Sequence, residues 1–462
     1  MVFSSPVFLC MFLPLVLITY NLSKNITYKN IILVMASLFF YAWGEPTYVV
    51  LFMISILMNY ILGRIIDANY GRTGARIGFI TALAIDLGML AMFKYAGFLV
   101  SNVNALLHIS IPDPGIRLPL GISFYTFQML SYIIDVYKGE TRVQRSVIRF
   151  AAYVSMFPQL VAGPIVRYTD ISRELVSRSV SMRDFAEGAK RFSSGLCKKV
   201  IIANYAGNAA SLLLDAPRLS TASAWLGIAL YAFQIYFDFS SYSDMAIGLG
   251  RMFGFHFCEN FNYPYISRSI TDFWRRWHIS LSTFFRDYVY IPLGGNRYKA
   301  SRNLFIVWML TGLWHGASWN FIFWGLFYGI MLFVEKHSFK SFLQKLPPPF
   351  CYVYTLFIVL FGWALFYYTD MSSLTRWISS AFGLSGALYD LSSVTVFYGN
   401  LWLIAVCVLA STPLSRLFFN ALCRKSKVFA AVCEPLFTAA GIIVCFILLI
   451  GQTYNPFLYF RF

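Results

Sequence analysis

The chain consists mainly of long apolar runs separated by short polar segments. Runs close to the ~20 residues that a helix needs to cross a hydrocarbon layer occupy positions 3–20, 30–43, 46–63, 77–99, 221–250, 350–368, 394–411 and 430–451. Shorter or interrupted runs lie at 119–137, 147–166, 200–214, 303–314 and 318–334. This pattern predicts an all-α polytopic membrane protein in which residues 1–462 form a single integral membrane domain.

Lysine and arginine gather in alternate loops between these runs. Lys24, Arg72, Arg145 and Arg424 mark four such loops, whereas the segment 101–119 is poor in basic residues. Basic loops face the cytoplasm by the positive-inside rule, which predicts a multi-pass protein with both termini outside the cytoplasm. The first run has neither a basic flank nor a small-residue cleavage site, so we expect it to be retained as a span.

Composition narrows the class further. Only 12% of the residues are charged and 58% are hydrophobic, whereas soluble domains carry about a quarter charged residues. The net charge of +17 is accounted for by the basic loops, and no nucleic-acid-binding motif is present, so we expect no nucleic-acid partner. The eight cysteines form no C-x-x-C pair and predict no metal site. Walker, G-x-S-x-G and H-E-x-x-H motifs are also missing from the sequence.

One stretch, from about 167 to 302, mixes basic, polar and aromatic residues over a long distance. Irregular backbone at membrane depth is tolerated only where it is packed in protein or lines an aqueous cavity. We therefore expect a cytoplasm-facing layer of amphipathic and re-entrant helices around a cavity.

His315 stands in "LTGLWHGASW" at 310–319, within strongly apolar surroundings. The run "NLFIVWMLTGLW" enters the membrane after Arg302 and would cover about 18 Å of the ~30 Å core. Because basic residues flank both this run and the next one, we expect a hairpin with His315 at its tip near the bilayer centre. An intramembrane histidine is a functional candidate, although a hydrogen-bonded structural histidine remains the alternative.

A second histidine, His278, lies in "DFWRRWHISLSTFFRDYVYIPLGG" beside Arg275, Arg276 and Arg286. These arginines either bind an anionic acyl donor, because guanidinium matches phosphate oxygens, or extend toward lipid headgroups from an interfacial helix.

Two acidic residues of a neighbouring apolar run, Asp238 and Asp244, have a similar ambiguity. They relay protons or bind an ion, or else they pair with arginines of the 267–303 stretch, and we favour the pairing.

With these residues in view, the chain resembles the membrane-bound O-acyltransferase (MBOAT) family. It is most similar to the bacterial branch that O-acetylates alginate or peptidoglycan and includes the teichoic-acid D-alanyl transferases. The motifs that carry the resemblance are "MVFSSPVFL" at 1–9, "LPLGISFYTFQMLSYIIDVYKG" at 118–139, "FPQLVAGPIVR" at 157–167, "YFDFSSYSDMAIGLGRMFGF" at 236–255, "FWRRWHISLSTFFRDYVYIPLGG" at 273–295, "LTGLWHGASWNFIFWGLFYG" at 310–329 and "NPFLYFRF" at 455–462.

The resemblance implies a ring of about 11 transmembrane helices, with re-entrant and amphipathic helices around a central tunnel in a bacterial inner membrane. It implies that His315 is the catalytic histidine and His278 the second active-site position. The acyl donor would be cytosolic acetyl-CoA, used as a substrate, and the acceptor a cell-surface polysaccharide such as alginate or peptidoglycan. Transfer of D-alanine to teichoic acid is the alternative within the family.

The ending "NPFLYFRF" is similar to that of a small partner peptide in the D-alanyl system. By this likeness Tyr459 carries the acyl group to a periplasmic lipase-like O-acetyltransferase, while an aromatic residue at the membrane interface is the simpler interpretation. A proton-coupled transporter or flippase that uses Asp238, Asp244 and His315 is the rival outside the enzymes. The lack of paired sequence repeats weighs against it.

Overall fold

Helices make up all the regular structure in the described part of the chain. A computed structural model describes residues 1–462 except 385, 427, 452–456 and 459–462. Within those limits the elements are α-, 3-10 and π-helices, without strands. The prediction of an all-α protein is confirmed.

Several of these helices are long and apolar enough to cross a membrane. By length and composition, five segments of the described chain qualify, and a sixth is added if a pair bent by 63° counts as one span. The five are α2 (Ile26–Gly44), α3 (Tyr48–Ala68), α4 (Thr73–Leu107), α17 (Pro348–Tyr367) and the stretch Phe429–Ile450, and the bent pair is α19 (Leu391–Gly399) with α20 (Leu401–Ala410). The count of about 11 membrane helices stays a prediction.

The contacts within the chain divide it into two units. Unit 1 comprises Met1–Phe192 and Ser243–Cys258, and unit 2 comprises Ser193–Tyr242 and Glu259–Phe462. Two helices, α9 (Met182–Cys197) and α11 (Thr221–Met252), contribute residues to both units. The single domain expected from the sequence stays a prediction.

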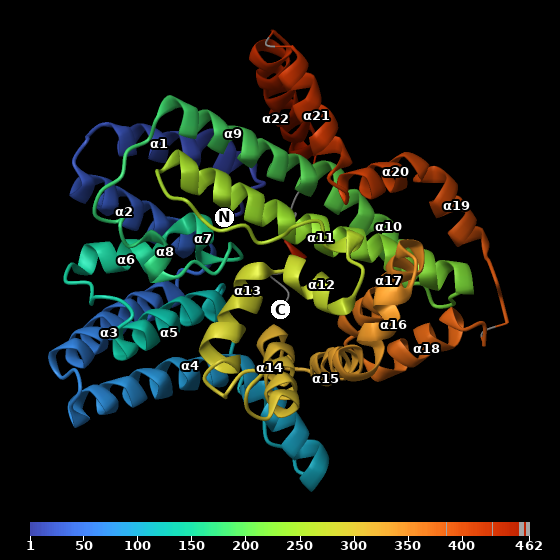
Figure 1. The fold of residues 1–462 in the computed structure, drawn as a ribbon, viewed down its shortest axis with the longest axis horizontal. Helices are drawn as coiled ribbons and strands as arrows, with labels where there is room; N and C mark the ends of the chain where they lie inside the picture. Colours follow the sequence, from blue (N-terminus) through green and yellow to red (C-terminus); the bar gives the residue numbers. More distant parts are fainter. Residues whose placement is uncertain (385, 427, 452–456, 459–462) are drawn as a thin grey trace. The chain divides into compact units, whose positions relative to one another are not determined.

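Unit 1 contains the first apolar runs. In Figure 1, α3 and α4 lie side by side with α5. Besides α2, α3 and α4, the helices of this unit are η1 (Phe8–Phe12), α1 (Leu13–Asn21), α5 (Ile122–Lys138), α6 (Val147–Ser155), α7 (Phe157–Leu160), α8 (Tyr168–Ile171) and the first part of α9.

A half-buried arginine ties unit 1 together. Arg178 donates from Nη1 to Asn30 Oδ1 at 2.7 Å and from Nε to the Tyr20 hydroxyl at 2.8 Å. The Tyr20 hydroxyl in turn donates to the Phe253 carbonyl at 2.6 Å. These bonds join α1 and α2 to the residue that follows α11.

Residues 193–242 and 259–302 of the stretch that the sequence singled out belong to unit 2. The stretch 167–302 combines short helices with the 32-residue α11. The expected layer of amphipathic and re-entrant helices facing the cytoplasm stays a prediction. The remaining helices of unit 2 are η2 (Lys198–Ala203), α10 (Asn204–Leu214), η3 (Pro264–Ile266), α12 (Ile270–Arg276), α13 (Ile279–Phe285), η4 (Arg286–Tyr290), α14 (Ala300–His315), α15 (Trp319–Val334), η5 (Glu335–Phe339), α16 (Lys340–Lys345), α18 (Met371–Ala381), α21 (Leu414–Lys425), η6 (Phe429–Cys433) and α22 (Glu434–Ile450).

The helices α14 and α15 form a closely packed hairpin. Only residues 316–318 separate them, and α17 packs against α15 (Figure 1). A Cβ on Gly312 would overlap the carbonyl oxygen of Phe321 and lie 3.3 Å from the Cα of Gly325. A Cβ on Gly325 would in turn meet the Trp308 carbonyl oxygen at 2.5 Å. The two glycines therefore permit backbone contact between the helices, and the predicted hairpin around residues 316–318 is confirmed.

We expect Gly312→Ala to lower the free energy of unfolding by about 1–3 kcal/mol, because the added methyl group overpacks this contact. The matched control is Gly88→Ala in the middle of α4, where an added Cβ meets nothing within 4 Å. There the higher helix propensity of alanine should leave stability unchanged or raise it by up to ~1 kcal/mol. Unfolding in detergent micelles measures both variants, and equal stability of the two would contradict the role of the glycine contact.

Candidate functional site

His315 is the last residue of α14 and is only 7% exposed. The helix ends there because Gly316 and Ser318 both have an extended backbone, and Ser318 is the N-cap of α15. Aromatic rings surround the imidazole: the ring centroids of Trp314 and Trp324 both lie 4.9 Å away, and that of Phe366 lies 5.2 Å away. His315 is thus held at the tip of the hairpin in an almost wholly aromatic setting.

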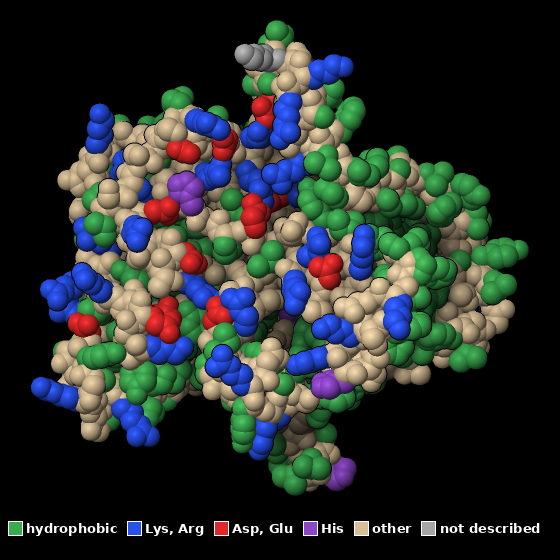
Figure 2. Space-filling view, in the orientation of Figure 1, with side chains coloured by type: hydrophobic (Ala, Val, Ile, Leu, Met, Phe, Trp, Pro, Cys, Tyr) green, Lys and Arg blue, Asp and Glu red, His purple; other side chains and the backbone are tan. Residues whose placement is uncertain are grey.

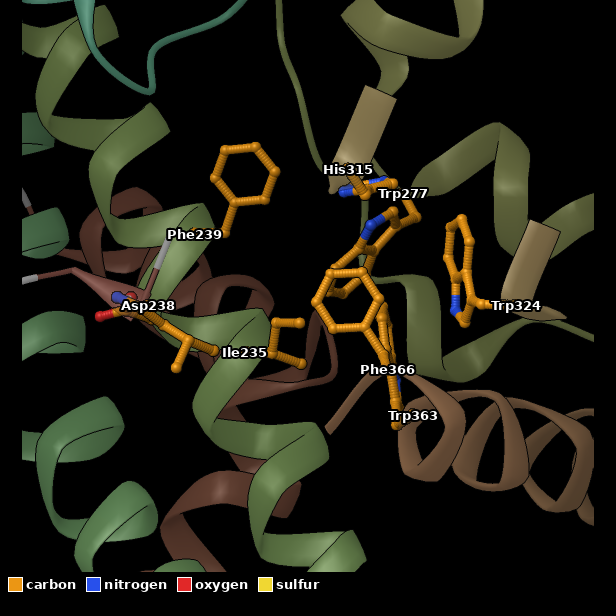
Figure 3. Close-up of a pocket in the computed structure, with 9 residues that line it drawn as sticks. Ile235, Asp238, Phe239, Trp277, His315, Trp324, Trp363 and Phe366 are labelled. Carbon is orange, nitrogen blue, oxygen red and sulfur yellow. The ribbon is translucent and has the colours of Figure 1, made fainter. Parts of the chain in front are cut away.

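A narrow cavity lies against this ring. Its volume of about 20 Å³ has room for about one water molecule. In Figure 3 the α11 side chains lie on one side and His315 with the tryptophans on the other. The lining residues are Ile235, Asp238, Phe239, Trp277, His315, Trp324, Trp363, Phe366 and Leu458. Asp238 and His315 are the two ionisable side chains of this lining.

His278 is buried behind the cavity wall and does not line the cavity. It is 1% exposed, and its ring makes an edge contact at 4.6 Å with Phe239, which does line the cavity. Both His278 and His315 touch the same indole, that of Trp314. The structure therefore brings the two predicted histidines to one aromatic cluster.

The hydrogen bonds of Asn260 fix the tautomer of His278. Asn260 Oδ1 accepts from the backbone N–H of Ser280 at 3.2 Å, so this atom is an acceptor. His278 Nδ1, 3.1 Å from the same oxygen, must then donate its proton to it. Within the described residues Nε2 has no hydrogen-bond partner. Burial lowers the pKa of the His278 imidazole well below its usual range, so Nε2 is an unprotonated acceptor.

The backbone at His278 is also unusual. The residue precedes α13 with φ 44° and ψ 56°, in the left-handed region. Residues other than glycine occupy this region only when their surroundings enforce it, and such positions concentrate at functional sites. The bond to Asn260 supplies one such constraint.

A buried carboxylate that sequence reasoning missed, Glu335, connects the hairpin to the His278 segment. It is 4% exposed and accepts the backbone N–H groups of Ile270 at 2.7 Å and Thr271 at 2.9 Å. These are two of the unpaired donors at the start of α12, where negative charge is favourable. Its position directly after an apolar run was the available signal.

The three candidate donor-binding arginines lie on or after α12 and α13, and two of them already have carboxylate partners. Arg276 contacts Asp272 at 2.9 Å, and Arg286 contacts Asp287 at 2.6 Å. Arg275 is exposed and has no carboxylate partner in the described part of the chain. Figure 2 shows Lys and Arg side chains around a hollow near α12–α14.

The acidic residues of α11 have other partners than we expected. Asp238 pairs with Lys199 at 2.5 Å, and Asp244 pairs with Arg191 at 2.6 Å. The expected pairing of Asp238 with an arginine of the 267–303 stretch is wrong, because the η2 lysine occupies that position. Sequence offered no signal for this, since Lys199 and Asp238 are 39 positions apart.

Tyr459 lies outside the described residues, but the two residues before it are described. Leu458 lines the cavity, and Phe457 is 1% exposed. Among the described residues, no group of three or more His, Cys, Asp or Glu side chains is arranged to hold a metal ion.

Comparison with known proteins relates the chain to one family of acyltransferases. Residues 139–375 match the model of the membrane-bound O-acyltransferase family. The chain is 40% identical to the probable alginate O-acetylase AlgI of Azotobacter vinelandii over the full length of both proteins. It is 36% identical to the peptidoglycan O-acetyltransferase of Helicobacter pylori over 84% of this chain and 80% of the relative. Identity to the teichoic acid D-alanyltransferase of Bacillus subtilis is 32%, over 48% of this chain and 60% of the relative.

We expect Glu335→Ala to lower the free energy of unfolding by about 2–4 kcal/mol, because it leaves two backbone donors of α12 without their charged acceptor. Glu335→Gln keeps one acceptor oxygen and should lower the free energy of unfolding by about half as much. The control is Glu140→Ala, whose side chain is 57% exposed and which should change stability by less than ~0.5 kcal/mol. Denaturant titration in micelles measures all three, and a neutral Glu335→Ala variant would contradict the proposed connection.

Proposed function

The chain belongs to the membrane-bound O-acyltransferase family, and from this premise we propose that it moves an acetyl group from cytosolic acetyl-CoA toward hydroxyl groups of a cell-surface polysaccharide. It is a multi-pass membrane protein and an O-acyltransferase. The identity of 40% over the full length of an alginate O-acetylase makes alginate the first acceptor to test, with peptidoglycan as the second.

The observation that carries the proposal is the position of His315 at the tip of a hairpin and against a cavity. Transfer from a thioester to a hydroxyl needs a base for the hydroxyl proton. In the proposed step the His315 imidazole takes that proton while the hydroxyl oxygen bonds to the carbonyl carbon. The carbon–sulfur bond then breaks, and the imidazolium returns the proton to the departing sulfur, which leaves as the thiol of CoA.

His278 and the three arginines would serve the two substrates in different ways. The unprotonated Nε2 of His278 favours orienting a hydroxyl over donating a hydrogen bond to the carbonyl oxygen. Arg275, Arg276 and Arg286 would bind the phosphates of acetyl-CoA. Arg275 is the strongest of the three candidates, because Arg276 and Arg286 would have to exchange a carboxylate for the phosphate.

The finer architecture belongs to the same proposal. We place the protein in the bacterial inner membrane, with both termini outside the cytoplasm and with about 11 transmembrane helices around a tunnel. Tyr459 would accept the acetyl group and pass it to a periplasmic lipase-like O-acetyltransferase. The family match weighs against a transporter or flippase. Transfer of D-alanine is less favoured, because its relative matches only 48% of this chain.

We expect His315→Ala to lower the rate of acetyl transfer from radiolabelled acetyl-CoA by about 10²–10⁴-fold, the usual contribution of a general base. His337→Ala, which removes an exposed histidine of η5, should retain the rate of the unaltered protein. Both are assayed in purified protein in liposomes. A His315→Ala protein that transfers acetyl at the normal rate would overturn the catalytic role, and movement of a lipid without thioester cleavage would support the transporter.

We expect Tyr459→Phe to abolish transfer of acetyl to the polysaccharide while thioester cleavage continues more slowly with water as acceptor. The missing phenolic oxygen is the reason, since phenylalanine keeps the ring but has no acceptor group. Tyr398→Phe at an exposed tyrosine of α19 is the control. Mass spectrometry should find an acetyl ester on the 455–462 peptide of the unaltered and Tyr398→Phe proteins and none on that of Tyr459→Phe. Normal polysaccharide acetylation by Tyr459→Phe would argue against the carrier.

A further inference from the structure

A buried ion pair in unit 2 also binds the backbone of the 457–458 segment. The side chains of Lys199 and Asp238 are each 4% exposed, and their charged atoms lie 2.5 Å apart. Lys199 contacts Asp238 Oδ1, while Asp238 Oδ2 accepts the backbone N–H of Leu458 at 2.6 Å. Each carboxylate oxygen therefore has a separate partner.

The residue before Leu458 is held by the same pair. Phe457 is 1% exposed, and the Lys199 ammonium lies 4.5 Å from the centroid of its ring. The ring of Tyr242 makes an edge contact with Phe457 at 5.0 Å. The lysine thus contacts both a carboxylate and an aromatic face.

The arrangement does more than neutralise two charges. A buried pair can often be replaced by apolar residues without loss of stability, so an ion pair by itself explains little. Here Asp238 also lines the cavity beside His315, and Leu458 lines the same cavity. The carboxylate therefore holds a backbone N–H, and with it the register of the segment, at the wall of the candidate active site.

We propose that Lys199, Asp238 and Tyr242 form a docking site for the 457–458 segment and act as positioning residues for the acceptor that follows it. The bond to the backbone N–H of Leu458 fixes the register of the segment at the cavity wall. The residue that follows Leu458 in the sequence is Tyr459. The acceptor role of that residue rests on the proposed function, whereas the docking itself does not.

The test compares two double variants in the full-length chain. Lys199→Met with Asp238→Asn removes both charges but keeps an oxygen that accepts the Leu458 N–H. Lys199→Met with Asp238→Leu removes both charges and the acceptor, with a side chain of similar size. Both double variants lose the ion pair, so its effect is the same in each. Any difference in behaviour between the two variants therefore reports the hydrogen bond from position 238 to the Leu458 N–H.

Leu458→Cys supplies the readout, in a chain whose eight native cysteines are replaced by alanine. Only the side chain changes, so the backbone N–H remains. We expect a water-soluble maleimide to label this cysteine at least ~10-fold faster in the Asp238→Leu variant than in the Asp238→Asn variant, at equal thermal stability. Equal labelling rates would overturn the docking site, as would faster labelling that tracks a lower melting temperature.

A second measurement separates this proposal from the acyltransferase mechanism. With position 458 restored to leucine, we expect the Asp238→Leu variant to transfer acetyl to polysaccharide at least ~10-fold more slowly than the Asp238→Asn variant, with the KM for acetyl-CoA unchanged. Equal transfer, with labelling still different, would overturn the positioning role and leave the docking. Failure of the proposed function would appear instead as normal activity of His315→Ala, with the labelling difference intact.

Discussion

The backbone contact between α14 and α15 at Gly312 and Gly325 determines where His315 lies. Only three residues join these helices, and they pack along each other. A residue without a Cβ is needed where a carbonyl group of one helix touches the other. The turn is then short and rigid, so the imidazole at the end of α14 has little freedom. The rings of Trp314, Trp324 and Phe366 pack around it and restrict it further.

In the short helices next to the hairpin, buried side chains supply partners for backbone donors at the helix starts. Glu335 accepts two donors at the start of α12, and Asn260 accepts from Ser280 and His278 near the start of α13. Because Glu335 directly follows α15, the hairpin and the His278 segment are joined by hydrogen bonds as well as by the Trp314 contacts. The same polar side chains that permit irregular backbone also orient the second histidine.

Sequence predicted those parts of the site that depend on local pattern. The hairpin follows from the apolar runs and the turn residues on either side of His315, and the helical class follows from run length. The partner of Asp238 did not follow, because an ion pair between distant segments leaves no periodic trace in the sequence. Asn260 and Glu335 were missed for a related reason. Their side-chain oxygens accept hydrogen bonds from backbone N–H groups. Every residue except proline has such a group, so the sequence does not show which residue is the donor.

The cavity places a carboxylate and an imidazole on one lining, and their surroundings give them different tasks. Asp238 has both oxygens engaged, one by the Lys199 ammonium and one by a backbone N–H. A carboxylate held in this way is suited to fixing geometry. His315 lies on the same lining at the end of α14, against the rings of Trp324 and Phe366. In the function that we propose, the two groups therefore divide the work: the carboxylate fixes the 457–458 segment, and the imidazole takes the hydroxyl proton that acyl transfer from a thioester releases.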